Sequence, residues 1–103
     1  MIIDKEIIEE SIYLYGELLQ TVVCMEELAE LTQQLSKNIR KSSNEEDLIS
    51  EIADVYICLD MITAINNIDS NKIQCEIYRK QERQRKRMLE SKSDLRINED
   101  SGK

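Results

Sequence analysis

The near absence of helix-breaking residues constrains the fold of this chain most strongly. No proline occurs among its 103 residues, and the two glycines are Gly16 and Gly102. Apolar residues recur at helical spacing along most of the chain, with Ile, Leu and Val in place of Phe and Trp, which are both absent. Because proline and glycine are the least favourable residues in a helix interior, the composition predicts an all-α fold.

Breaks in the apolar periodicity divide the chain into four predicted helices. They cover about residues 4–15, 17–40, 45–67 and 70–89. Gly16 is expected to end or bend the first helix. Ser43 with Glu46 fits a capping box for the third helix, and Asp69 is a suitable N-cap for the fourth.

These helices predict one all-α domain over residues 1–90. Residues 91–103 hold little apolar content, which is typical of a mobile polar tail. A chain of this size buries only a modest core. We therefore expect a homo-oligomer, either a dimer or a tetramer, in which the amphipathic helices pack against another subunit.

Two acidic pairs interrupt the apolar faces of the second and third helices. Glu27 and Glu30 continue the stripe on which Val23 lies, and Glu51 and Asp54 have the same spacing. Residues three apart share a helix face, with Cβ atoms about 5–6 Å apart. Packing the two helices together would gather four carboxylates, whose repulsion a divalent cation would offset. One such pair is ordinary on a solvated helix, but two in register with apolar stripes predict a metal site.

The charge distribution argues against several function classes. Residues 1–60 hold 14 acidic and 4 basic side chains, so we do not expect a nucleic-acid partner, since binding to phosphate backbones relies on positive charge. The N-terminus has neither a signal-like pattern nor a membrane-spanning segment, which predicts a cytoplasmic protein without a membrane partner. The absence of histidine argues against di-iron sites, zinc hydrolases and histidine-dependent nucleophiles.

Cysteine usage agrees with a reducing compartment. Cys24, Cys58 and Cys75 are far apart, without the CxxC spacing of redox or zinc motifs. We therefore expect buried or half-buried free thiols.

The acidic pairs carry a family resemblance. They read Glu26-Glu27-Leu28-Ala29-Glu30 and Glu51-Ile52-Ala53-Asp54, which is similar to the EExxE and ExxD signature of the MazG-like nucleotide pyrophosphohydrolases, in the all-α NTP pyrophosphatase superfamily. The resemblance covers roughly residues 5–90. The surrounding sequence resembles the small phage- and prophage-type members.

The resemblance implies a Mg²⁺-dependent enzyme, with Mn²⁺ as a possible substitute, that converts a nucleoside or deoxynucleoside triphosphate to the monophosphate and pyrophosphate. It also implies a four-helix-bundle core completed by oligomerisation. Glu27, Glu30, Glu51 and Asp54 match the metal ligands. Glu26 matches the first position of the signature, near the metal and the attacking water, and is the candidate catalytic residue.

A basic run near the end of the chain offers a candidate phosphate-binding site. Lys80, Arg83 and Arg87 share one face of the fourth helix, and a similar Lys-x-x-Arg element in small family members resembles a phosphate clamp. A solvated basic helix end is an equal alternative. Without Trp or Phe to stack on a base, the preferred nucleotide is not apparent. The alternative for the whole chain is a non-enzymatic helical scaffold or nucleotide-binding module.

Overall fold

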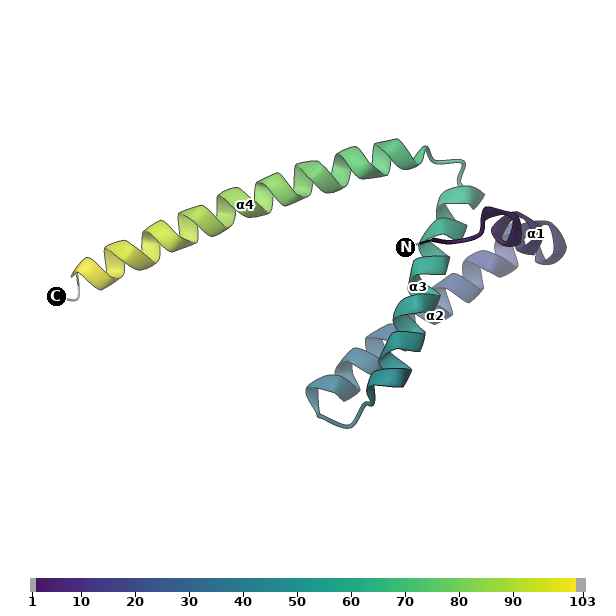
Figure 1. The fold of residues 1–103 in the computed structure, drawn as a ribbon, viewed down its shortest axis with the longest axis horizontal. Helices are drawn as coiled ribbons and strands as arrows, with labels where there is room; N and C mark the ends of the chain where they lie inside the picture. The colour runs from purple at the N-terminus through teal and green to yellow at the C-terminus, as the bar shows by residue number, and fades with distance from the viewer. Residues whose placement is uncertain (1, 102–103) are drawn as a thin grey trace. The chain divides into compact units, whose positions relative to one another are not determined.

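The computed structural model describes residues 2–101, with side chains as far as Arg96. The helices are α1 (Lys5–Tyr15), α2 (Glu17–Ile39), α3 (Glu45–Ile65) and α4 (Ser70–Ser101). No strand occurs among the described residues. The prediction of an all-α fold is confirmed (Figure 1).

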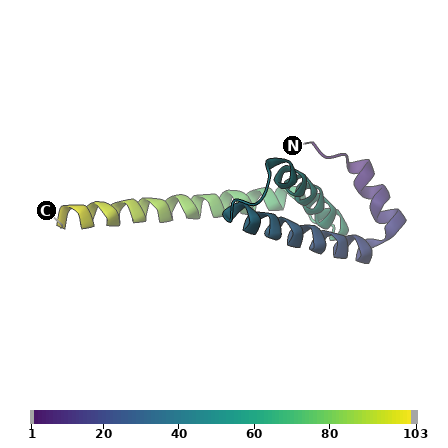
Figure 2. The same cartoon turned by 90° about the horizontal axis from the view of Figure 1, so that it is seen from below.

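The chain divides into two compact units, Met1–Ile68 and Asp69–Lys103. In the first unit, α2 and α3 run side by side in opposite directions, and α1 contacts both (Figures 1 and 2). The buried core of this unit consists of Ile8, Cys24, Cys58 and Met61. The second unit holds α4. Because three helices make up the first unit, the four-helix-bundle core stays a prediction.

Gly16 separates α1 from α2, as the sequence predicts. Its φ angle of 88° lies in a region that residues with a Cβ rarely adopt. The backbone N–H of Gly16 donates a hydrogen bond to the Ile12 carbonyl at 2.8 Å. At the other end of α1, the Asp4 carboxylate accepts a hydrogen bond from the Glu6 amide at 2.9 Å, which satisfies one of the free donors of the first turn.

The N-cap of α3 differs from the prediction by one residue. Asn44, not Ser43, caps the helix: its side-chain oxygen accepts from the Asp47 amide at 2.8 Å, and its Nδ2 donates to the Asp47 carboxylate at 3.0 Å. The Ser43 hydroxyl instead donates to the Asn38 side chain at 3.2 Å. Asn and Ser are similarly good N-caps, so the sequence alone does not separate the two registers.

This cap leads to a testable expectation for stability. Asn44→Ala should lower the free energy of unfolding by about 1 kcal/mol, because it leaves the Asp47 amide without its partner. The control Ser43→Ala should change it by less than about 0.5 kcal/mol. Urea denaturation of both variants would measure the difference. A larger loss for Ser43→Ala than for Asn44→Ala would favour the capping box with Glu46 instead.

The link between α3 and α4 follows the predicted signals. Asn67, just after the end of α3, has a φ angle of 52°, a conformation that Asn tolerates better than most residues. The Asp69 carboxylate then accepts a hydrogen bond from the Asn71 amide at 2.9 Å, as expected of an N-cap.

Helix α4 extends beyond its predicted end near Leu89 and reaches Ser101. Residues 90–101 contain neither glycine nor proline, so nothing in this segment breaks the helix. Its polar composition leaves few apolar side chains to pack against another element. The mobility predicted for residues 91–103 stays a prediction, and its last two residues lie outside the described part of the chain. None of the helices described has an apolar stretch long enough to cross a membrane.

Apolar side chains remain exposed on the first unit. Leu18 on α2 is 80% exposed, and Leu19 on α2 and Leu59 on α3 are each 51% exposed. Surface of this kind, when contiguous, is typical of a protein–protein contact.

Candidate metal centre

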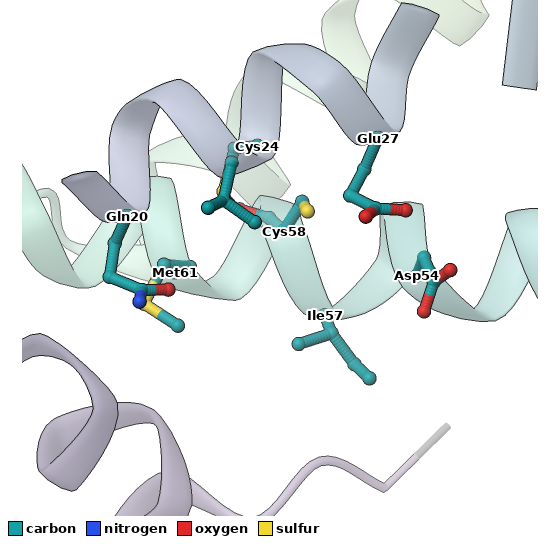
Figure 3. Close-up of a pocket in the computed structure, with 8 residues that line it drawn as sticks. Gln20, Cys24, Glu27, Asp54, Ile57, Cys58 and Met61 are labelled. Atoms are coloured by element: carbon teal, nitrogen blue, oxygen red, sulfur yellow. The ribbon is translucent and has the colours of Figure 1, made fainter. Parts of the chain in front are cut away.

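Helices α2 and α3 bring three of the predicted ligands together. One carboxylate oxygen each from Glu27, Glu51 and Asp54 lies within 4.8 Å of the other two. Glu27 comes from α2, whereas Glu51 and Asp54 lie one turn apart on α3. Figure 3 shows the side chains of Glu27 and Asp54 near each other, one on each of the two neighbouring helices. All three side chains are half-buried, so water only partly screens their mutual repulsion.

The pKa values of two of these acids reflect first their burial and then that repulsion. Burial raises the pKa of Glu27 to about 7, with further contributions from Asp54, Glu30 and Glu51. Burial also raises the pKa of Glu51, followed by the negative charges of Glu30 and Asp54. Part of the cluster is therefore protonated near neutral pH when no cation is bound.

Two buried oxygens in the cluster lack hydrogen-bond partners. Within the described residues, Glu27 Oε2 and Glu51 Oε2 are buried without a donor. Leaving a buried acceptor unsatisfied costs about 1–3 kcal/mol, and a cation coordinated by both oxygens would remove this cost. Mg²⁺ takes carboxylate oxygens as ligands, so the donor set fits this ion.

The two remaining acids of the signature are more exposed. Glu30 is exposed, and it is not among the three carboxylates that share the cluster. It still contributes to the raised pKa values of Glu27 and Glu51, which places it beside them. Glu26 is also exposed and, one residue before Glu27, projects from α2 in a different direction. The roles of Glu30 as a ligand and Glu26 as a catalytic residue stay predictions.

The candidate phosphate-binding residues lie on α4, in the second unit. Lys80, Arg83 and Arg87 are all exposed. The ion pairs found within the described part of α4 join Arg79 to Glu76 and Arg85 to Glu82. The three predicted residues are thus free of ion pairs along that stretch, and their contact with phosphate stays a prediction.

The sequence analysis did not anticipate that two thiols lie beside the carboxylates. Cys24 and Cys58 are free and buried, as expected, whereas Cys75 on α4 is exposed, contrary to the expectation of a buried or half-buried thiol. Helix α4 by itself offers no core in which Cys75 could be buried. The available signal was spacing: Cys24 precedes Glu27 by three residues, and Cys58 follows Asp54 by four.

The raised pKa of Glu27 predicts how the metal-free protein responds to pH. The folded state holds a proton on Glu27 with a pKa of about 7, against 4.5 for the ordinary side chain. The resulting stabilisation is complete below pH 4.5 and is lost as the pH rises to about 7. The raised pKa of Glu51 acts in the same direction. The pKa of Glu76 is lowered, mainly by its hydrogen bond to Arg79. The stability that this interaction contributes is lost as the pH falls, so Glu76 does not account for a loss of stability between pH 5 and pH 8.

Urea midpoints in the presence of a chelator would test this prediction. The wild-type protein should be more stable at pH 5 than at pH 8, and Glu27→Gln should remove most of the difference, because glutamine does not titrate. Glu10→Gln, at an exposed position of α1, should leave the difference intact. An undiminished pH dependence in Glu27→Gln would contradict the assignment to Glu27.

Comparison with known proteins adds no relative. No protein-family model matches the chain, and neither a curated protein nor a solved structure matches it significantly. The resemblance to MazG-like enzymes therefore rests on the motif residues, and membership of that family stays a prediction.

Proposed function

We propose that this protein is a Mg²⁺-dependent nucleoside triphosphate pyrophosphohydrolase that releases a nucleoside monophosphate and pyrophosphate. The observation that carries the proposal is the meeting of Glu27, Glu51 and Asp54 within 4.8 Å between two helices. The unpartnered oxygens of Glu27 and Glu51 support the presence of a cation. The resemblance of both acidic motifs to the MazG-like signature supports the choice of reaction.

The residues of the chain then take separate roles. Glu27, Glu51 and Asp54 would hold Mg²⁺, with Glu30 at the exposed edge of the same cluster. When bound, Mg²⁺ supplies positive charge for phosphate oxygens and lowers the pKa of a bound water. Glu26 would accept a proton from the attacking water.

The basic residues of α4 complete the proposal. As the resemblance implies, Lys80, Arg83 and Arg87 would bind phosphate oxygens through charge-assisted hydrogen bonds. Their exposure leaves their donors available to a phosphate ligand.

Isotope labelling tests the reaction directly. The purified protein is incubated with a panel of NTPs and dNTPs in H₂¹⁸O, with Mg²⁺ or with a chelator, and the first products are analysed by mass spectrometry. Attack of water at the α-phosphorus places the label in the monophosphate. We expect labelled monophosphate and unlabelled pyrophosphate, and no products in the chelator arm.

Three outcomes would contradict the proposal in different ways. A diphosphate and orthophosphate as first products would mean cleavage between the β- and γ-phosphates, so the reaction would be wrong although the metal centre stood. No turnover of any nucleotide, together with Mg²⁺-dependent nucleotide binding, would favour the nucleotide-binding module. Neither turnover nor binding would favour the scaffold.

We also infer that the protein forms a homo-oligomer. The exposed leucines of α2 and α3 (Leu18, Leu19 and Leu59) would be covered by another subunit, since their burial is favourable by roughly 25 cal/mol per Å². Sedimentation at micromolar concentration should give at least twice the chain mass of 12.1 kDa. Leu18→Glu should weaken the association. A 12.1 kDa monomer with a cooperative melt would contradict the inference.

A further inference from the structure

A pocket next to the carboxylate cluster has no role in the reaction as described so far. It has a volume of about 140 Å³ and lies between α2 and α3. Figure 3 shows Glu27 and Asp54 at one end of it and Gln20 and Met61 at the other. The two acids also belong to the proposed Mg²⁺ centre. A substrate whose phosphates are held by the cation therefore has this pocket directly beside it.

Apart from the two acids, the lining of the pocket is mostly apolar. Its other members are the Gln20 amide and the side chains of Val23, Cys24, Ile57, Cys58 and Met61. Cys24, Cys58 and Met61 are at most 5% exposed, so they form the closed bottom of the pocket. The Cys24 thiol donates its hydrogen bond to the Cys58 carbonyl at 3.7 Å. Apolar walls with a few polar groups are typical of a site for an organic ligand.

The size of the pocket limits what can be buried in it to one ring. Pockets that enclose a drug-sized molecule have volumes of roughly 300–1,000 Å³, so a whole nucleotide does not fit into about 140 Å³. An apolar cavity of about 150 Å³ holds one benzene molecule. Because buried side chains close the bottom of the pocket, a second fused ring would stay outside.

The position of Gln20 suits recognition of the edge of such a ring. Gln20 and Glu27 are seven residues apart on α2, which places them on one helix face about two turns, or roughly 10 Å, apart. This is similar to the span of a pyrimidine nucleotide from its α-phosphate to the far edge of its base. A carboxamide offers both donors and an acceptor, and the edges of cytosine and uracil each present a donor beside an acceptor.

We propose that this pocket binds the base of a pyrimidine nucleotide and that Gln20 recognises the edge of that base. The side chains of Val23, Ile57 and Met61 contact the ring, and a thioether sulfur is a favourable neighbour of an aromatic ring. Aliphatic and sulfur atoms thus replace the Trp and Phe that the chain lacks. The inference rests on the proposed function for the reaction and adds the class of base.

Steady-state kinetics with CTP, UTP, ATP and GTP in the presence of Mg²⁺ test this preference. We expect kcat/KM to be at least about tenfold higher for the two pyrimidine nucleotides, as is usual when a pocket discriminates by shape. Gln20→Leu should lower kcat/KM for CTP and UTP about 5–100-fold, because it leaves the polar edge of the base unpaired. The same variant should change the values for ATP and GTP by less than about twofold.

Two controls separate this effect from damage to the fold or to the metal centre. Gln33→Leu makes the same change at an exposed position of α2 and should leave all four kcat/KM values within about twofold of those of the wild-type protein. Gln20→Leu should retain the full Mg²⁺-dependent rise in melting temperature, since Gln20 is not among the three clustered acids.

A binding experiment that needs no catalysis uses free nucleosides. In protein labelled with ¹³C at its Met and Ile methyl groups, cytidine and uridine should shift the signals of Met61 and Ile57. Adenosine at the same concentration should leave these signals in place. Met25 on α2 is 64% exposed and does not line the pocket, so its signal should not respond to any of the nucleosides.

The outcomes distinguish failure of the pocket from failure of the proposed function. Values of kcat/KM that are equal or higher for purine nucleotides would overturn the proposal, and so would an equal loss for all four nucleotides, or no loss, in Gln20→Leu. Hydrolysis without shifts at Met61 and Ile57 would keep the enzyme and remove the pocket as its base site. Shifts at both residues without hydrolysis of any nucleotide would support the pocket and remove the enzyme.

Discussion

Asp54→Asn is expected to abolish nucleoside triphosphate hydrolysis. Asp54 lies within 4.8 Å of both Glu27 and Glu51, so its carboxylate is central to the proposed Mg²⁺ centre. Asparagine has nearly the same shape but no negative charge, and it provides one neutral oxygen in place of the carboxylate. Loss of an outer-shell partner commonly reduces metal affinity or activity 10–100-fold. Loss of a direct ligand should therefore reduce kcat/KM by more than about 100-fold.

Asp60→Asn provides the matched control. Asp60 lies on the same helix and is exposed, so the same change of charge there should leave kcat/KM within about twofold of the wild-type value, as expected of a surface substitution. Melting curves of both variants without Mg²⁺ would separate a loss of activity from a loss of folding. Full activity in a folded Asp54→Asn variant would exclude Asp54 as a ligand required for turnover.

Mg²⁺ is expected to stabilise the folded protein strongly. The carboxylates meet through the packing of α2 on α3, which the unfolded chain lacks, so Mg²⁺ binds the folded state preferentially. Stabilisation equals RT ln(1 + [L]/Kd), which is about 2.7 kcal/mol at a hundredfold excess over Kd. For a domain of this size, that corresponds to a rise in melting temperature of roughly 10–20 °C. Calorimetry across a Mg²⁺ series would measure it.

Glu51→Gln should remove most of this Mg²⁺-dependent rise in melting temperature. The buried Oε2 of Glu51 lacks a hydrogen-bond partner within the described residues, and the substitution removes half the charge contributed by the acids of α3 to the cluster. Without Mg²⁺, the variant should be as stable as the wild-type protein or more so, because it relieves repulsion from Asp54. Glu10→Gln should retain the full shift. Equal melting temperatures of the wild-type protein with and without Mg²⁺ would argue against the site.

Local sequence determined the helices and most of their ends. Gly16, Asn67 and Asp69 mark boundaries because the conformation of a turn depends on residues within about four positions of it. The same locality explains the differences found. Ser43 and Asn44 are both suitable caps, and the polar residues after Leu89 contain no helix breaker before Gly102, so propensity alone neither chose the cap nor ended α4.

The acidic motifs can also be recognised in the sequence, but their spacing predicts only which residues share a face of one helix. It does not predict which residues of two helices meet. The spacing of Glu27 and Glu30 predicts that they share a face of α2, and both were expected to be ligands. In the fold, Glu27 meets Glu51 and Asp54, whereas Glu30 remains exposed. The register and crossing of α2 against α3 decide which carboxylate faces the neighbouring helix, and those quantities depend on contacts between residues far apart in the chain.

Tertiary structure alone placed the two buried thiols together. Cys24 and Cys58 are 34 residues apart, and each by itself reads as a small core residue. Packing of α2 on α3 sets them opposite each other beside Glu27 and Asp54. A sequence specifies helix faces through a period of 3.6 residues, but which faces meet is decided by the burial of apolar surface across the whole unit, because that energy is not local to any one helix.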